Sequence, residues 1–440
     1  MKTLLQNATI VNEEESFTGS LLIEDDRISQ ISRTGNISSA GAEVIEAEGC
    51  LLLPGVIDDH VHFREPGLTR KATMHTESMA AAAGGVTSVL DMPNVIPQTT
   101  TIDLLKERQR LGREEMHVNH AFFLGATNDN LEQVKRLDTA SSPGVKLFMG
   151  SSTGNMLVDR EETLRKLFAE CPSLIMAHCE DTARINRRAE EYRALYGEDP
   201  CVQYHSEIRD EEACWESSRL AASLATETGA RLHIAHISTM EELTLASPES
   251  GITLEVCVPH LLYSTDDYGR LGSRIKCNPS VKSPRHRRAL REALSSGAVT
   301  TIGTDHAPHL LSEKEGGALK AVSGMPMVQF SLVSMLTLAD EGVLTKERLV
   351  RLMCHNPATL FGISQRGFLR EGYKADITLV RPCRHTIEKE EILSLCGWSP
   401  REGDTVGYEV LGTWVNGQRV WDGKSVRTDV KGEALRFVHE

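Results

Sequence analysis

The sequence has 440 residues, of which 40% are hydrophobic and 25% are charged, so it can bury a large core and is not disordered in composition. Its 62 acidic and 48 basic residues give a net charge of −14, which argues against a surface that binds nucleic acid. No apolar stretch approaches the roughly 18 residues of a membrane span, and the cysteines form no CxxC pair. We therefore expect a reduced, cytoplasmic, globular protein that binds neither membranes nor nucleic acid.

Both ends of the chain have the pattern of short β-strands. The first fifty residues alternate between apolar and polar positions, with turn residues between the runs, over residues 3–11, 20–23, 27–31 and 44–46. A similar alternation of apolar and polar positions occurs over residues 376–380, 406–414 and 419–421, with the turn signal Asn416-Gly417 before the last run. We expect residues 1–53 and 366–440 to form one small β-sandwich domain together.

Between these ends, apolar runs alternate with helical patterns. The expected strands cover residues 56–59, 86–91, 118–124, 145–149, 174–177, 232–235, 254–258 and 300–303. Helical segments between them include residues 101–111, 160–170, 211–228 and 284–296. Alternation of helices with continuously apolar strands is typical of parallel α/β folds. Eight repeats favour a closed (β/α)8 TIM barrel over residues 54–365, with an open sheet as the alternative.

Several possible metal ligands stand at the ends of these strands. His60 and His62 are two residues apart in a strand, so both side chains point to the same face. Alone, such a pair could equally be a core or surface feature. His178, His236 and Asp305 each follow a different strand, however, and the carboxyl ends of barrel strands meet at one mouth. Imidazoles and a carboxylate together suit zinc or another divalent transition ion.

Lys146 lies in an apolar strand, where an ammonium facing cations would be electrostatically unfavourable. Reaction of its amine with CO2 would give a carbamate, whose two oxygens could bridge two metal ions. The residue type alone also allows a lysine that points outward or neutralises a substrate anion.

These residues, in this order on eight βα units, resemble the amidohydrolase superfamily. The string HVHFREPG at residues 60–67 is similar to the dihydroorotase family in particular, of the kind with a carbamylated lysine. Further matching strings are MPN at 92–94, KCNP at 276–279, TDHAPH at 304–309 and NPA at 356–358. The resemblance covers nearly the whole chain and implies a composite β-sandwich beside the barrel.

The resemblance also implies a site and a reaction. One divalent ion, zinc above all, would be bound by His60, His62 and Asp305, and a second by His178 and His236, with carbamylated Lys146 as the bridge. Asp305 would move the proton between the attacking water and the ring nitrogen. The substrates would be N-carbamoyl-L-aspartate and dihydroorotate, interconverted in pyrimidine (UMP) biosynthesis. The substrate-binding residues implied are His62, Arg64, Asn94, Asn278, His309, Ser323 and Gly324.

The substrate prediction depends on Arg64, because a guanidinium can bind a ring carboxylate through two parallel hydrogen bonds. Its alternative role is a surface arginine paired with Glu65. Rival functions are an allantoinase or dihydropyrimidinase-like cyclic amidase, or an inactive dihydroorotase-like structural partner. Residues 309–317 could form a mobile lid or a solvated loop. By analogy with the superfamily, the chain could form a homodimer or homotetramer.

Overall fold

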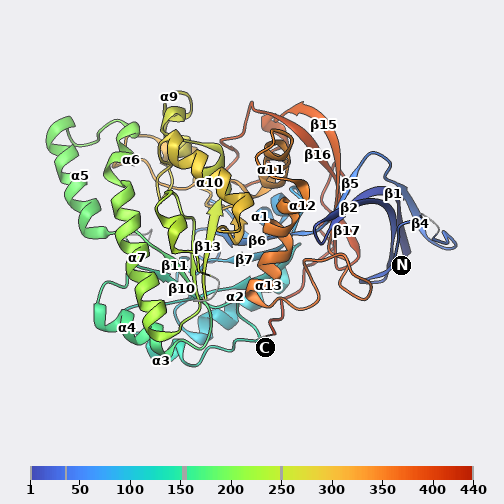
Figure 1. Cartoon of the computed structure of the whole chain (residues 1–440), viewed down its shortest axis with the longest axis horizontal. Coiled ribbons are helices and arrows are strands. Elements are labelled where there is room, and N and C mark those ends of the chain that lie inside the picture. Colours follow the sequence, from blue (N-terminus) through green and yellow to red (C-terminus); the bar gives the residue numbers. More distant parts are fainter. Residues whose placement is uncertain (1, 35–36, 151–155, 248–250, 439–440) are drawn as a thin grey trace.

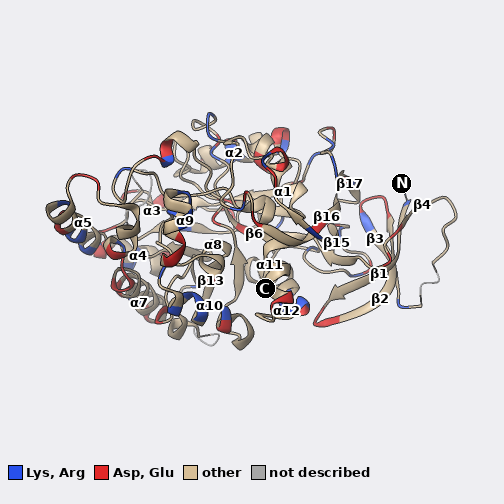
Figure 2. Ribbon diagram, turned by 90° about the horizontal axis from the view of Figure 1, so that it is seen from above, with Lys and Arg blue, Asp and Glu red and all other residues tan. Residues whose placement is uncertain are grey.

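The computed structural model describes residues 2–34, 37–150, 156–247 and 251–438. Figure 1 shows two parts, a body of strands surrounded by helices and, at one side, a curved sheet whose blue and red strands come from the first and last parts of the sequence. In Figure 2, acidic and basic residues are intermingled over the outer helices. Among the described residues, no helix is both long and apolar enough to cross a membrane.

The body is a parallel barrel. Neighbouring strands pair in parallel from β6 to β8 and from β9 to β14, and the single residue Phe123 separates β8 from β9. The ring closes beyond β14, where the backbone N–H of His62 donates to the carbonyl of His306 at 2.8 Å. The strands are β6 (Val56–Val61), β7 (Val86–Asp91), β8 (Asn119–Phe122), β9 (Leu124–Gly125), β10 (Val145–Phe148), β11 (Ile175–His178), β12 (Leu232–Ile234), β13 (Ile252–Cys257) and β14 (Thr301–Gly303). The predicted (β/α)8 fold is confirmed.

Helices connect the barrel strands and cover them on the outside (Figure 1). Their ends follow the sequence, because the side chains of Thr101 and Asp210 cap the first turns of α2 and α7, and Gly229 ends α7 in the left-handed conformation. The helices are α1 (Met74–Ala83), α2 (Ile102–Glu115), α3 (Leu131–Val134), α4 (Glu161–Glu170), α5 (Thr182–Tyr196), α6 (His205–Ile208), α7 (Glu211–Thr228), α8 (Val258–Leu262), α9 (Tyr268–Leu271), α10 (Pro284–Ser296), α11 (Ser331–Asp340), α12 (Lys346–Val350) and α13 (Asn356–Phe361).

The strands at the two chain ends form one mixed sheet, so both ends contribute to one β-rich part beside the barrel. Its order is β17-β16-β15-β5-β1-β2-β3, and β4 pairs with β1. Apolar side chains from both ends, including Leu5, Ile23, Ile377 and Trp414, form its own core. The strands are β1 (Lys2–Asn12), β2 (Glu15–Glu24), β3 (Arg27–Ser32), β4 (Glu43–Glu46), β5 (Leu51–Pro54), β15 (Ile377–Thr386), β16 (Thr405–Val415) and β17 (Gln418–Trp421).

The two ends of the chain contact the barrel as well as the sheet. Strand β5 extends to Pro54, the expected first residue of the barrel, and pairs with β15. The last described residues leave the sheet and return to the barrel, where the N–H of Leu435 donates to the carbonyl of His120 at 2.9 Å. The N-terminal and C-terminal strands therefore hold the barrel at more than one point.

Candidate active site

The structure brings the predicted site residues to the carboxyl ends of the barrel strands. His60 lies in β6, Lys146 in β10 and His178 at the end of β11, while His236 and Asp305 lie two residues beyond β12 and β14. One pocket is lined by His60, His62, Arg64, Asn94, Phe148, His178, His236, Asn278, Asp305, Ala307, Ser323 and Gly324. Of the other two predicted residues, Lys146 is beside His60 and His309 is beside Arg64.

His60, His62 and Asp305 form a compact set of metal-ligating groups. Asp305 Oδ1 is 3.0 Å from His62 Nε2 and 3.5 Å from His60 Nε2. The other ring nitrogens are held from behind, since His60 Nδ1 lies 2.8 Å from Glu255 and His62 Nδ1 lies 2.7 Å from Asn94 Oδ1. Because these partners are acceptors, both rings carry their proton on Nδ1 and present a bare Nε2 to the pocket, as metal-ligating histidines do.

His178 and His236 form a second set next to the first. His178 Nδ1 and His236 Nε2 are 2.9 Å apart, and the rings of His60 and His236 have centroids 5.2 Å apart. His236 Nδ1 is buried and has no hydrogen-bond partner among the described residues. Burial keeps the pKa of both His60 and His236 well below the usual range. The charge of Lys146 adds to this effect at His60, and the charge of His178 adds to it at His236. Neutral imidazoles with an unused nitrogen are the form that binds divalent metals, so the residues fit such an ion.

Lys146 is fully buried within this group. Its Nζ lies 3.5 Å from His60 Nε2 and 5.5 Å from the ring centroid of Phe148, and no carboxylate among the described residues is within hydrogen-bonding distance of it. Burial lowers its pKa. The outward-facing alternative for this side chain is therefore wrong, and a buried amine with a lowered pKa is the form of lysine that reacts with electrophiles.

Backbone geometry at the site is unusual. Arg64, His236 and Asp305 have positive φ angles of 64°, 39° and 46°, although none of them is glycine. Such angles cost roughly 1 to 3 kcal/mol each and persist only where the surroundings impose them. The fold therefore holds three side chains of the candidate site in directions that a relaxed strand end would not give.

Sequence reasoning missed two carboxylates behind the histidines. Glu255 in β13 accepts from the ring of His60 and from the backbone N–H of His236, each at 2.8 Å. Glu180 lies 3.1 Å from His178 Nε2 and pairs with Arg209. A glutamate in the middle of an apolar strand was the available signal for Glu255.

Cys257 also lies within metal-binding reach of His60 and Glu255. Burial, followed by the charge of Glu255, holds the pKa of this thiol well above its usual range. Because metals bind the thiolate, the group of His60, Glu255 and Cys257 is a poor metal site. The group of His60, His62 and Asp305 is the better candidate.

Arg64 lies inside the pocket wall and not on the surface. Arg64 is only 3% exposed. Its Nε donates to the carbonyl of Pro308 at 3.2 Å, and its Nη2 lies 3.0 Å from His309 Nε2. Burial lowers its pKa to about 10, so it stays charged at neutral pH. Glu65 instead accepts from the backbone N–H of Met74. The alternative of an Arg64–Glu65 surface pair is therefore wrong.

The segment at 309–317 is fixed at several points. Lys314 is buried and its ammonium donates to the carbonyls of Lys276, Val322 and Gly324 at 3.0, 2.7 and 2.7 Å. The backbone N–H of Gly317 donates to Asp199 at 2.6 Å. A lid motion of this segment would have to break these contacts, and it stays a prediction.

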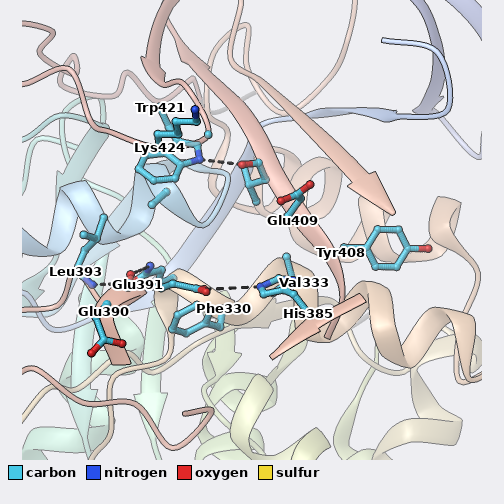
Figure 3. A pocket seen from close by; sticks show the side chains of 14 residues that line it. Phe330, Val333, His385, Glu390, Glu391, Leu393, Tyr408, Glu409, Trp421 and Lys424 are labelled. Carbon is cyan, nitrogen blue, oxygen red and sulfur yellow. Dashed lines mark hydrogen bonds and ion pairs between the residues drawn. The ribbon is translucent and has the colours of Figure 1, made fainter. Parts of the chain in front are cut away.

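A second cleft, of about 490 Å³, lies between helix α11 and the end sheet (Figure 3). Figure 3 shows Trp421, Phe330 and Val333 around it, with the carboxylates of Glu390 and Glu409 and the ring of His385. Neither group of possible metal ligands found among the described residues lies in this cleft. The histidine pocket is therefore the candidate for chemistry.

Known proteins resemble this chain over nearly its whole length. The model of the amidohydrolase family matches residues 51–420. The chain is 33% identical to the dihydroorotase of Methanosarcina acetivorans, over 98% of this chain and 94% of that one. It is 31% identical to the allantoinase of Bacillus velezensis, over 98% and 97% of the two chains. The solved structure of L-hydantoinase from Arthrobacter aurescens superposes with a TM-score of 0.91 at 29% identity and covers 97% of each chain.

Proposed function

This chain belongs to the amidohydrolase family, and we propose that it is a dihydroorotase that closes N-carbamoyl-L-aspartate to L-dihydroorotate and hydrolyses the same ring amide in reverse. The observation that carries this proposal is a buried guanidinium, that of Arg64, beside a pocket of metal-ligating side chains. Dihydroorotate carries a ring carboxylate, whereas dihydropyrimidines and allantoin do not. A buried arginine is the preferred partner for such a group.

The proposed metal site holds two divalent ions, with zinc as the expected metal. His60, His62 and Asp305 would bind one ion, His178 and His236 the other, and a carbamate on Lys146 would bridge them. Bound there, the ions would polarise the amide carbonyl and make water a nucleophile at neutral pH. The unused His236 Nδ1 and the buried amine of Lys146 support this arrangement.

Asp305 is placed to move the proton. Its Oδ1 faces the pocket 3.0 Å from His62 Nε2, and its side chain is 12% exposed, so it can reach both water and substrate. In hydrolysis it would accept a proton from the attacking water and pass it to the departing ring nitrogen. The same carboxylate would work in the opposite order during ring closure.

The remaining predicted residues would bind the substrate. Asn94 uses its Oδ1 on the ring of His62, which leaves its amide N–H groups for the substrate carboxylate. Asn278 similarly uses Oδ1 toward His205, at 3.1 Å. With His309 and the backbone at Ser323 and Gly324, these groups would surround the ring.

The relatives named allantoinase and L-hydantoinase define the rival substrates. The decisive experiment is an ultraviolet assay of dihydroorotate consumption by the purified protein, with the hydrolysis of allantoin, dihydrouracil and hydantoin measured separately. We expect dihydroorotate to give the highest kcat/KM. A higher value for any of the other three would overturn the proposal.

A variant pair sharpens this assay. Arg64→Met should reduce kcat/KM for dihydroorotate by at least about a hundredfold, since hydrogen bonds to charged groups are worth about 1.5 to 3 kcal/mol each. Arg70→Met, which changes an exposed arginine on the same segment, should leave it unchanged. The rival function of an inactive structural partner predicts no tightly held metal, and metal analysis of the protein tests it.

We also propose a cytoplasmic homodimer or homotetramer. All ten cysteines are free in the structure, in keeping with a reducing compartment. Sedimentation would give the oligomeric state.

A further inference from the structure

His309 lies between two cationic side chains, one of which has no role so far. Arg64 Nη2 is 3.0 Å from its Nε2, and Lys71 Nζ is 3.0 Å from its Nδ1. The ring is 1% exposed. Burial, followed by the charges of Arg64 and Lys71, holds the pKa of His309 far below its usual range, so the imidazole is neutral.

This arrangement has one hydrogen-bond acceptor too few. An ammonium and a guanidinium can only donate, and a neutral imidazole offers one donor and one acceptor. Two donors therefore approach a ring that can accept from only one of them. Whichever nitrogen carries the proton, one of the two 3.0 Å contacts joins two donors.

The surroundings of Lys71 decide which nitrogen accepts. Its Nζ also pairs with Glu313 Oε1 at 3.2 Å, and Glu313 is itself held by the backbone N–H of Leu310 at 3.0 Å. The side chain of Lys71 is only 12% exposed, so it has little freedom to turn away. If this fixed ammonium donates to Nδ1 of His309, the ring proton lies on Nε2.

We propose that Lys71 is a positioning residue that makes His309 a hydrogen-bond donor toward the substrate carboxylate. With the proton on Nε2, two donors, Nε2–H of His309 and Nη2–H of Arg64, face each other at the pocket wall. An oxygen of the substrate carboxylate, placed within reach of both N–H groups, accepts from both of them. The two donors then no longer lack an acceptor. This inference rests on the proposed function and adds the residue that prepares its carboxylate site.

The proposal predicts what happens when Lys71 is removed. In Lys71→Met, Arg64 is the only donor left beside the ring, so Nε2 becomes its acceptor and the proton moves to Nδ1. The hydrogen bond between Arg64 and His309 then competes with the substrate carboxylate. We expect KM for dihydroorotate to rise about tenfold or more, as for the loss of one charge-assisted hydrogen bond, while kcat changes little because the metal-ligating residues are untouched.

Nitrogen-15 NMR of the histidine rings in the holoenzyme tests the inference without using activity. The His309 signal is identified by its loss in His309→Asn. We expect a neutral ring with the proton on Nε2 in the wild type and in Lys71→Arg, which keeps a donor-only cation, and on Nδ1 in Lys71→Met. A wild-type proton on Nδ1 overturns the proposal without any change at Lys71.

The matched control is Arg70→Met. Arg70 is exposed and shares the partner Glu313 at 2.6 Å but does not touch His309, so its removal should change neither KM nor the ring signal. An unchanged KM in Lys71→Met would also overturn the proposal. If the wild type does not act on dihydroorotate, the proposed function fails, whereas the NMR result still decides the role of Lys71.

Discussion

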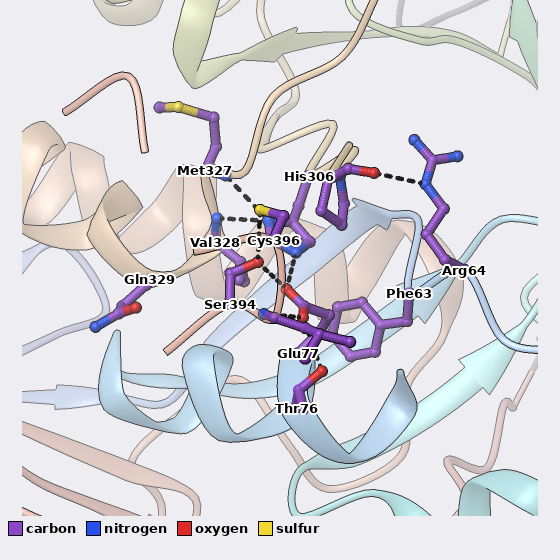
Figure 4. A network of polar contacts seen from close by, with 12 residues as sticks. Phe63, Arg64, Thr76, Glu77, His306, Met327, Val328, Gln329, Ser394 and Cys396 are labelled. Atoms are coloured by element: carbon purple, nitrogen blue, oxygen red, sulfur yellow. Dashed lines mark hydrogen bonds and ion pairs between the residues drawn. The ribbon is translucent and has the colours of Figure 1, made fainter. Parts of the chain in front are cut away.

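His306 Nε2 donates to the buried carboxylate of Glu77 across 2.8 Å and so ties the residue after Asp305 to helix α1 (Figure 4). On the other side of the ring, Nδ1 accepts from the backbone N–H groups of Met327 and Val328 at 3.0 and 3.2 Å. Figure 4 shows Ser394 joining the same carboxylate, at 2.6 Å, from the segment that leads to the end sheet. One neutral imidazole therefore fixes the backbone at the mouth of the barrel from three directions.

Removal of this imidazole should destabilise the fold strongly. His306→Leu leaves a buried carboxylate without its ring donor and two buried N–H groups without an acceptor. We expect the free energy of unfolding to fall by about 3 kcal/mol or more, measured by urea denaturation. Ser394→Ala removes a single donor and should cost only about 1 kcal/mol. Equal losses in the two variants would show that the ring is not the centre of the network.

Glu255→Gln should weaken metal binding without dismantling the pocket. The glutamine keeps the shape of the side chain but removes the charge that orients the ring of His60 and the backbone at His236. Loss of such a supporting carboxylate typically lowers metal affinity by about 10 to 100-fold, which competition with a chromophoric chelator measures.

Glu242→Gln is the control for this experiment. Glu242 is an equally buried carboxylate, held by Ser218, Ser238 and Thr239 away from the pocket. Its loss should lower stability but not metal affinity. If both variants lost metal equally, the effect would come from general unfolding and not from Glu255.

Gly303 in β14 is required by close packing and not by backbone conformation. A Cβ atom there would lie 2.2 Å from Glu255 Oε1 and 2.8 Å from Asp59 Oδ1. Gly303→Ala should therefore push β14 away from β13, displace Asp305 and reduce both bound metal and stability, the latter by about 1 to 3 kcal/mol. Gly407→Ala, in β16, would meet nothing closer than 3.9 Å and should be tolerated. The predictions are tested by measuring the metal content and the thermal unfolding of the two variants.

The strands and the histidines and aspartate that meet in the pocket were predictable from the sequence because both depend on local patterns. Apolar runs marked the barrel strands to within a few residues, and a polar residue after a run marked a side chain that lines the pocket. Glu77 and His306 show the limit of this reasoning, since they lie 229 residues apart and meet only in the folded chain. Lys71 was missed for a related reason, because a lysine in a polar stretch looks solvated until the fold buries it against His309 and Glu313.

The buried ammonium of Lys314 should make stability depend on pH. Burial, followed by the charge of Lys276, lowers its pKa to about 7, whereas a lysine in an unfolded chain has a pKa of about 10.4. Between these values the unfolded state binds more protons than the folded state, so the contribution of Lys314 to the free energy of unfolding rises as pH increases above 7. Below pH 7 both states are protonated, and the contribution is constant and unfavourable.

Lys314→Met removes this titration and also leaves three carbonyls without their donor. We expect the stability of the wild type relative to this variant to rise from pH 7 to pH 9, by up to about 1.4 kcal/mol for each pH unit. Lys276 remains in both proteins, and Lys320→Met, which changes an exposed lysine close to Lys314 in the sequence, is the control. Urea denaturation at several pH values measures this, and a fall in the relative stability of the wild type over this range would contradict the buried ammonium.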